Sequence, residues 1–388
     1  MNKKNIKILK ILMTFIVIVL VVELVYIVYL FFFTKDNNIY FDGTNSFIYN
    51  NKSEYVAVGS NNDNDKYYEK GKITVYDKDL NKVTEKLYNK GYKSAFLDIV
   101  EDNDGYVVVG SYEKSKSDNE NNIRRALIVK YDLAGNILFE KDFRDAINSS
   151  FTGIIKEEDG YVAVGYSISD TNKDGGAYII KYDKTGNIIW KSNYGDKTNA
   201  KFKDLIKVDD YYYVVGIDKK NISVLCKFDN NGKLIKDSIY KYTDNLGFTG
   251  IVYYNDYLYI TGNRKSKGEN SLGNALLVKY STDLKREKEV VYSNDKASRY
   301  NTLDIDNNTI IVIGTINENK QYDGLIGKYD SDLNVIVTKE LGSSSDTYFN
   351  DIIIVDGKYR VIGYSSYNKN YLTKFITFSD ALRILESK

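Results

Sequence analysis

Histidine and proline are absent from this chain of 388 residues, and cysteine occurs once. Without histidine, the chain cannot form a Ser-His-Asp or Cys-His catalytic pair, and it has no imidazole to bind a metal or to transfer protons near neutral pH. Without proline, its turns have to be formed by Gly, Asn, Asp and Ser. The single cysteine, Cys226, cannot form an internal disulfide. Because it lies in the strand-like run Val224–Phe228, we expect a buried, unreactive thiol.

The chain also lacks an excess of charge of either sign, with 54 basic and 53 acidic residues. The first 36 residues contain five lysines, one glutamate and one aspartate, which leaves 49 basic and 51 acidic residues for the remainder. Proteins that bind nucleic acids normally carry a basic excess, because neutralising phosphates releases counterions. The composition therefore predicts no nucleic-acid partner.

One long hydrophobic run is present, from residue 11 to residue 33. Its 23 residues are enough to cross about 30 Å of hydrocarbon as a helix, and no small-residue cleavage site follows. Lysines precede it at positions 3, 4, 7 and 10, whereas only Lys35, beside Asp36, follows closely. The positive-inside rule then predicts a cytoplasmic tail (1–10), an uncleaved signal anchor in the cell membrane (11–33), a linker (34–39) and an extracytoplasmic domain (40–388).

Glu23 lies near the middle of this predicted span. A charged carboxylate at that depth costs about 2.5–3.5 kcal/mol on insertion scales. One interpretation is that Glu23 contacts a second transmembrane helix, so that the chain is a subunit of a membrane complex. The alternative is a neutral glutamic acid that faces lipid or reaches toward water. The sequence leaves both open.

The rest of the chain is a repeat with a period near fifty residues. The phrase Asp159-Gly-Tyr-Val-Ala-Val-Gly165, followed by Lys181-Tyr-Asp-Lys-Thr-Gly-Asn-Ile-Ile-Trp190, recurs in degenerate form. Its closing glycines fall at positions 59, 110, 165, 216, 262, 314 and 363. A period of this length with strand-like segments is typical of a β-propeller.

Each unit divides into four short segments with strand and hairpin signals. In the third unit they are residues 151–156, 161–167, 177–183 and 188–194. In six units an aromatic residue precedes the repeat glycine by fourteen positions, whereas in the first unit Phe47 precedes Gly59 by twelve. Seven units of four strands predict an all-β, seven-bladed propeller of antiparallel blades.

These motifs resemble those of exported bacterial β-propeller repeat proteins, whose units have the form Asp-Gly-Tyr-Val-Val-Val-Gly … Lys-Tyr-Asp-x-x-Gly-Asn. The resemblance extends from about Tyr40 to the end of the chain. It implies the propeller fold and an exported location. It implies no particular activity, because propellers host many functions.

Two positions after the first-strand aromatics, the chain carries a set of residues that equivalent blades would place in a ring around the propeller axis. The set comprises Asp98, Gly153, Asp204, Gly250, Thr302 and Asp351. The carboxylates of Asp98, Asp204 and Asp351 could bind a cation or a ligand at the mouth of a central channel, or act as paired acids in a glycan hydrolase or lyase. Alternatively, each accepts hydrogen bonds from nearby backbone N–H groups.

A second candidate for cation binding is Asp170-Thr-Asn-Lys-Asp-Gly175, which begins like an EF-hand calcium loop. Asp170, Asn172 and Asp174 would be the ligands. The twelfth position, where the loop needs a bidentate glutamate, is Lys181. Clusters of Asp, Asn and Gly are also ordinary turn formers. We therefore expect no obligatory cofactor, with calcium as the only candidate.

The loops between the second and third strands vary in length, whereas the rest of each unit does not. They cover about 61–70, 112–122, 167–176, 217–221, 263–273, 315–322 and 364–370. In a propeller these loops emerge on one face, and variable loops on a rigid frame are where binding usually resides. The sequence thus predicts a binding or scaffolding module for a protein or an envelope polymer, with the membrane-complex subunit and the glycan-active enzyme as alternatives.

Overall fold

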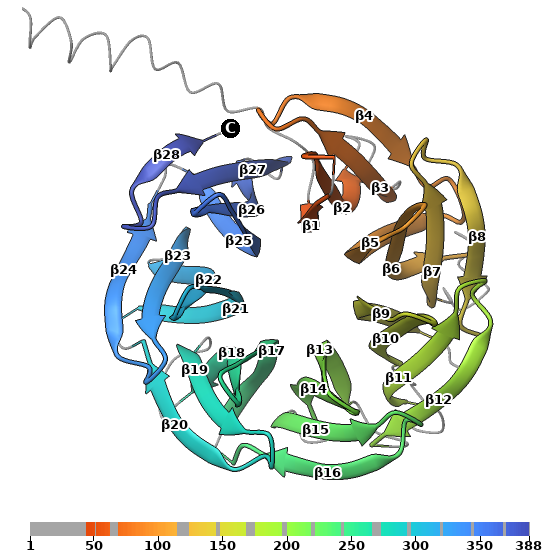
Figure 1. The fold of residues 1–388 in the computed structure, drawn as a ribbon. Coiled ribbons are helices and arrows are strands. Elements are labelled where there is room, and N and C mark those ends of the chain that lie inside the picture. The colour runs from red at the N-terminus through yellow and green to blue at the C-terminus, as the bar shows by residue number, and fades with distance from the viewer. Residues whose placement is uncertain are drawn as a thin grey trace, which may run out of the picture.

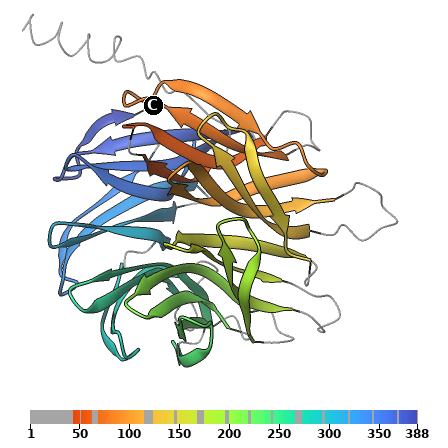
Figure 2. The same cartoon turned by 45° about the vertical axis from the view of Figure 1, so that its right-hand side comes forward.

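Seven four-stranded sheets surround one axis in the computed structural model, and each sheet is one blade of the propeller (Figures 1 and 2). The seven blades and their antiparallel pairing confirm the predicted fold. The structure describes residues 44–50, 52–62, 69–114, 124–144, 148–167, 175–195, 200–218, 222–241, 244–265, 273–292, 296–318, 321–342, 345–367 and 370–387.

The strands of the first four blades are β1 (Thr44–Tyr49), β2 (Tyr55–Asn62), β3 (Glu69–Tyr76), β4 (Lys82–Leu87), β5 (Lys93–Asp102), β6 (Gly105–Glu113), β7 (Arg124–Asp132), β8 (Ile137–Asp142), β9 (Ser149–Lys156), β10 (Gly160–Ser167), β11 (Gly176–Asp183), β12 (Ile188–Tyr194), β13 (Lys201–Val208), β14 (Tyr211–Ile217), β15 (Ser223–Asp229) and β16 (Leu234–Ile239). Those of the last three blades are β17 (Asp244–Tyr254), β18 (Tyr257–Lys265), β19 (Asn274–Ser281), β20 (Arg286–Val291), β21 (Ala297–Asp306), β22 (Thr309–Glu318), β23 (Gln321–Asp330), β24 (Val335–Leu341), β25 (Asp346–Val355), β26 (Lys358–Tyr367), β27 (Asn370–Phe378) and β28 (Ile384–Ser387).

Every blade is built from four consecutive strands, so the described strands show no exchange between the first and last blades. The first strand of each blade lies nearest the axis and the fourth lies at the outer edge of the propeller (Figure 1). The ring is closed instead by packing of the seventh blade against the first. Phe375 of β27 contacts Phe47 and Tyr76 edge-on, with ring centroids 5.9 and 5.1 Å apart.

The antiparallel order gives the propeller two different faces. The turns that join first to second strands and third to fourth strands lie on one face, which we call the turn face. The connections between second and third strands, which range from two residues in the last two blades to ten in the second, lie on the opposite face, which we call the loop face. The innermost strands begin at the loop face, because each follows a fourth strand that ends there.

The repeat glycine is required by a bulge in the innermost strand. In each blade the register shifts by one residue close to this glycine, as between Phe96 and Asp98 in β5. The bulge presses a backbone carbonyl onto the glycine: a Cβ on Gly110 would lie 2.0 Å from the oxygen of Ala95, and one on Gly165 would lie 2.1 Å from the oxygen of Ser150. A side chain at either position would force the two strands apart.

We therefore expect Gly165→Ala to lower the free energy of unfolding by about 2–4 kcal/mol, since backbone rather than a flexible side chain has to move. Urea denaturation measures this change. Gly342→Ala is the matched control, because its new Cβ would meet only the Asp323 carboxyl group, at 3.3 Å. Equal effects of the two substitutions would contradict the role assigned to the bulge.

The motif Lys-Tyr-Asp-x-x-Gly-Asn forms the turn between third and fourth strands. In the third blade, Asp183 Oδ1 accepts hydrogen bonds from the backbone N–H groups of Thr185 and Asn187, at 2.8 and 2.9 Å, and Asn187 Nδ2 donates to Asp183 Oδ2. Hydrogen bonds from the Thr185 hydroxyl and from Asn187 lower the pKa of Asp183 to about 2. This part of the repeat therefore stabilises the turn and has a structural role.

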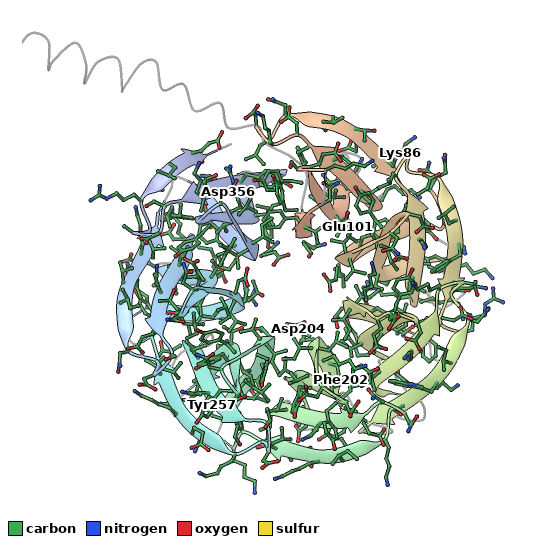
Figure 3. The ribbon with its side chains drawn as sticks, in the orientation of Figure 1. Lys86, Glu101, Phe202, Asp204, Tyr257 and Asp356 are labelled. Carbon is green, nitrogen blue, oxygen red and sulfur yellow. The ribbon has the colours of Figure 1, made fainter. Side chains whose placement is uncertain are left out.

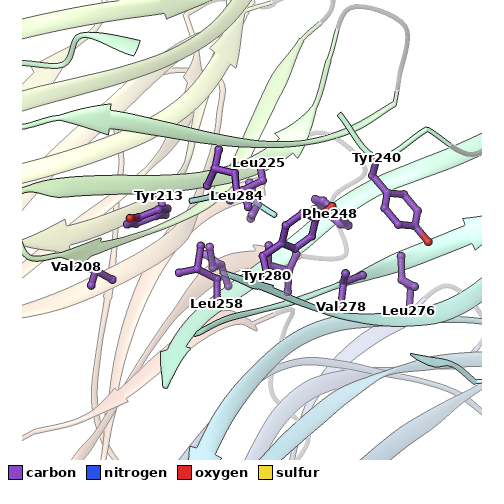
Figure 4. Close-up of a cluster of buried hydrophobic side chains, with 13 residues drawn as sticks. Val208, Tyr213, Leu225, Tyr240, Phe248, Leu258, Leu276, Val278, Tyr280 and Leu284 are labelled. Carbon is purple, nitrogen blue, oxygen red and sulfur yellow. The ribbon is translucent and has the colours of Figure 1, made fainter. Parts of the chain in front are cut away.

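A tyrosine near the start of the second strand joins neighbouring blades in several units. Its hydroxyl reaches the end of the innermost strand in the preceding blade; the pairs are Tyr106–Asn50, Tyr161–Asp102 and Tyr212–Glu157, with Tyr359–Asp306 as the equivalent pair in the last blade. Between the blades lie apolar clusters. Figure 4 shows the one between the fourth and fifth blades, where Leu225 of β15 and Phe248 of β17 belong to the same buried cluster.

The predicted tail, span and linker (1–39) lie outside the described residues, as do Glu23, Asp170, Asn172 and Asp174. Within the ranges given above, no helix is long and apolar enough to cross a membrane.

Candidate binding site at the loop face

The carboxylates predicted to form a ring occupy equivalent places in their blades. Asp98 pairs with Val109, Asp204 with Val215 and Asp351 with Ile362, and each partner directly precedes a repeat glycine. Figure 3 shows Asp204 beside the axis and Phe202 farther out in the blade. The structure thus places these three residues on one level around the axis.

Each of these carboxylates joins its own blade to the next one. Asp98 accepts a hydrogen bond from the N–H of Ile99 and one from Ile154 in the third blade, both at 2.8 Å. Asp204 accepts from Leu205 at 2.7 Å and from Ile251 in the fifth blade at 3.0 Å. Hydrogen bonds to a buried carboxylate contribute more than neutral ones, so these contacts hold the blades together.

Asp351 makes the same contact at the closing junction of the ring. It accepts from Ile352 at 2.9 Å and from Phe47 in the first blade at 3.1 Å. The Ser46 hydroxyl lies 2.7 Å from Asp351 Oδ2 and 3.1 Å from Asp98 Oδ1. A hydroxyl has one hydrogen, so Ser46 bonds to both carboxyl groups only when one of them is protonated.

The junctions without an aspartate are joined by the bulged residue instead. Its side chain donates to the carbonyl of the first-strand residue in the next blade; the pairs are Asn45–Phe96, Thr152–Phe202, Thr249–Tyr300 and Asn301–Phe349, at 2.5–2.9 Å. Together with Asp98, Asp204 and Asp351, these four residues provide one such contact at each of the seven junctions.

Burial raises the pKa of Asp98, Asp204 and Asp351 to about 7 in each case. The backbone N–H groups that they accept from oppose this shift, and the charges of the other ring carboxylates reinforce it. Asp304 lies in β21, two residues after the ring position Thr302. Burial raises its pKa too, to about 6.

No group of three or more Cys, Asp or Glu side chains is placed to hold a metal ion in the part of the chain that the structure describes. All the oxygens of Asp98 and Asp351 already accept hydrogen bonds from the protein. These hydrogen bonds give Asp98 and Asp351 a structural role between the blades, as the alternative interpretation of the sequence expects.

A second ring lies closer to the loop face, formed by the residues that pair with the position after each repeat glycine. We call it the inner rim: Ala95, Ser150, Lys201, Gly247, Arg299 and Tyr348. Of these six described members, two are cationic and none is acidic. Lys203, the bulged residue of β13, adds a third cation on the level below.

Two of these cations are unpaired. Lys203 and Arg299 are exposed and have no hydrogen-bond or ion-pair partner among the described residues. The Lys201 ammonium lies over the ring of Tyr166, 4.9 Å from its centroid. The pKa of the Lys203 ammonium is lowered, first because neighbouring protein atoms remove part of its hydration and then because of the positive charges of Lys201 and Arg299. Lys203 is therefore close enough to both Lys201 and Arg299 for their charges to act on it.

Beside Arg299 the inner rim continues into a stack of three tyrosines. Tyr348 lies between Tyr364 and Tyr322, with ring centroids 4.6 and 5.0 Å away and interplanar angles of 22° and 30°. Tyr348 and Tyr364 pair across β25 and β26, whereas Tyr322 comes from β23 of the sixth blade. All three side chains are half-buried.

On the other side, the inner rim borders a cavity of about 320 Å³ between the second and third blades. Ala95, Ser150 and Tyr166 line it, together with Lys93 and Arg124. A larger cavity of about 710 Å³ opens on the turn face between the third and fourth blades.

Four charged groups of the turn-face cavity form ion pairs with one another, whereas its fifth, Glu158, is exposed. Glu157 contacts Lys181 at 2.7 Å and Lys207 at 2.6 Å, and Lys181 also contacts Asp159. The cations of the larger cavity are thus paired, whereas Lys203 and Arg299 near the inner rim have no such partner among the described residues.

Sequence reasoning missed the ring member of the first blade. Phe47 pairs with Ala57, which lies two positions before the repeat glycine. In the second blade the residue in that place is Ile99, not the repeat aromatic, so Phe47 is not the equivalent of the repeat aromatic. The ring residue is Ser46, which pairs with Val58 and precedes Gly59 by thirteen positions rather than twelve. The turn between the first two strands has one residue more in this blade than in the second, which moves Ser46 one position farther from the glycine. Counting back from Gly59 with this extra residue would have identified Ser46.

The fold defines the class: the described strands form a seven-bladed β-propeller and show no strand exchange. No family model and no curated protein match the sequence. Among solved structures, the β-propeller domain of the Trilobed protease from Pyrococcus furiosus, described as having an open velcro topology, is similar with a TM-score of 0.50 at 12% identity, over 90% of this chain and 97% of that one.

Two further solved structures are similar to this chain. They are the WD40 domain of Toxoplasma gondii coronin (TM-score 0.49, 11% identity, 74% of this chain and 69% of that one) and the acylaminoacyl peptidase of Pyrococcus horikoshii (TM-score 0.49, 11% identity, 89% and 52%). At these identities the likeness concerns the fold alone. A propeller of this kind is consistent with a binding or scaffolding module.

Proposed function

We propose that this chain is a membrane-anchored, extracytoplasmic propeller that binds a protein or a polymer of the cell envelope at its loop face. The observation that carries the proposal is the difference between the faces. The loop face has the variable connections and the cations Lys203 and Arg299, which have no ion-pair partner among the described residues, whereas both lysines of the turn-face cavity are in ion pairs. Variable loops on a rigid frame are common binding surfaces.

The location rests on the sequence. The run 11–33 is long enough for a transmembrane helix, and the lysines before it favour a cytoplasmic N-terminus. The resemblance to exported bacterial propeller repeat proteins supports the same orientation.

Single cysteines on the two faces test both parts of the proposal in the full chain. Lys114→Cys lies at the loop face and Lys184→Cys at the turn face, and both positions are exposed. The native Cys226 is fully buried and burial raises its pKa, so it stays unreactive. In intact cells we expect a membrane-impermeant maleimide to label both variants. We expect a photo-crosslinker attached at position 114, but not at 184, to form adducts.

Labelling only after cell lysis would overturn the extracytoplasmic location. Adducts at position 184 and not at 114 would overturn the assignment of binding to the loop face.

A further inference from the structure

We propose that the inner rim of the loop face binds an anionic glycan, in which sugar rings carry carboxylate or phosphate groups. Lys201, Lys203 and Arg299 would contact the acidic groups, and the tyrosine stack would contact the sugar rings. This inference rests on the proposed function and names its ligand class.

The first argument is the arrangement of charge. Lys201 and Arg299 belong to the fourth and sixth blades, and the fifth blade contributes Gly247, which has no side chain, between them on the inner rim. Arg299 and Lys203 have no anionic partner among the described residues. A guanidinium and ammonium groups gathered in this way recognise carboxylate and phosphate oxygens.

No carboxylate among the described residues forms an ion pair with these cations. The nearest ring carboxylate in sequence, Asp204, directs its oxygens to the backbone N–H groups of Leu205 and Ile251. Asp346 accepts from the N–H of Tyr322 and from the Ser366 hydroxyl, at 3.0 and 3.3 Å. The inner rim thus presents positive charge although the chain as a whole is nearly neutral.

The second argument is the aromatic surface beside the cations. Tyr348 is the neighbour of Arg299 on the inner rim, and its stack with Tyr322 and Tyr364 places three half-buried tyrosines beside that cation. The negative face of an aromatic ring attracts polarised C–H groups, which one side of a sugar ring supplies, and hydroxyl groups bond to its edge. An acidic peptide would use the cations without needing the stack.

Binding can be measured with the full chain in detergent micelles. The probes are polygalacturonate, which carries carboxylates, phosphomannan, which carries phosphates, neutral dextran, polyglutamate and oligothymidylate. We expect one or both acidic glycans to bind, with an affinity that falls as salt increases, and we expect dextran not to bind. Binding of polygalacturonate alone would show that the site recognises carboxylates, and binding of phosphomannan alone would show that it recognises phosphates.

Two variants and their controls test the residues. Lys203→Gln with Arg299→Gln should weaken glycan binding at least about tenfold. Lys86→Gln with Arg383→Gln removes the same charge from exposed positions on outer strands and turns and should leave binding unchanged. Tyr322→Ser should weaken binding severalfold, whereas Tyr322→Phe keeps the ring and should not. Circular dichroism confirms folding of each variant.

Equal losses in the two double variants, or binding of polyglutamate or oligothymidylate as tight as that of the glycans, would overturn the proposal. If neither acidic glycan binds while position 114 still forms crosslinks, the glycan inference fails and the proposed function stands.

Discussion

Lowering the pH from 8 to 5.5 is expected to raise the melting temperature of the propeller by at least about 5 °C. In the folded chain the pKa of Asp98, Asp204 and Asp351 is about 7 in each case, against about 3.9 for an unfolded aspartate. Between these values the folded state binds more protons than the unfolded state. The free energy of unfolding therefore rises as the pH falls through 7, by at most about 2 kcal/mol per carboxyl group.

The Ser46 hydroxyl gives this dependence a structural basis. It lies within hydrogen-bond distance of Asp98 and Asp351, and both bonds form only when one of the two is protonated. The chain has no histidine, which is the side chain that usually titrates in this range. Asp304, with a pKa of about 6, contributes in the same direction.

Differential scanning calorimetry at a series of pH values measures the effect. Asp98→Asn, Asp204→Asn and Asp351→Asn should each make the dependence on pH shallower, because asparagine does not titrate. Asp132→Asn is the control, since hydrogen bonds lower the pKa of this exposed aspartate and keep it charged throughout the range. A melting temperature that does not change between pH 8 and 5.5 would show that the ring carboxylates stay ionised.

Asp351→Ala is expected to destabilise the propeller more than Asp204→Ala, by about 3–4 against about 2 kcal/mol. Both substitutions remove a carboxylate that accepts backbone N–H groups from its own and the next blade. The junction of Asp204 is also held by the chain itself, which passes from β16 to β17. The junction of Asp351 joins the first and last blades, which no chain segment connects directly.

Urea denaturation gives the two free energies, and hydrogen exchange locates the loss. In Asp351→Ala, exchange should increase first in β1 and β25 to β28, where the ring opens. In Asp204→Ala it should increase throughout the propeller without such a bias. Identical exchange patterns in the two variants would mean that the closing junction is no weaker than the others.

The number of blades, their strand order and the face that carries the variable loops could be predicted from the sequence, because the period and the hairpin signals are local. The equivalence of Asp98, Asp204 and Asp351 could be predicted too, since the count from the repeat glycine is constant. The partners of these residues could not, because they belong to the next blade and depend on the bulge. Fixed counting also missed Ser46, which one inserted residue displaces.

The inner rim escaped sequence reasoning for a related reason. Lys201, Arg299 and Tyr348 differ in type, so no shared motif indicates that they occupy the same position in three blades. Only the strand register places them on one ring. Likewise, the closeness of Lys203 to Arg299 depends on the curvature that brings the fourth and sixth blades together across the fifth.

The position of the first described strand determines how a membrane anchor would orient the propeller. Thr44 begins β1, the strand nearest the axis, at its loop-face end. Residues 34–43, which follow the predicted membrane span, can extend over at most about 35 Å. A helix at 11–33 would therefore tether the disc near its centre, with the loop face turned toward the bilayer. A ligand bound at the inner rim would then be kept close to the membrane surface, and would have to reach it from the side.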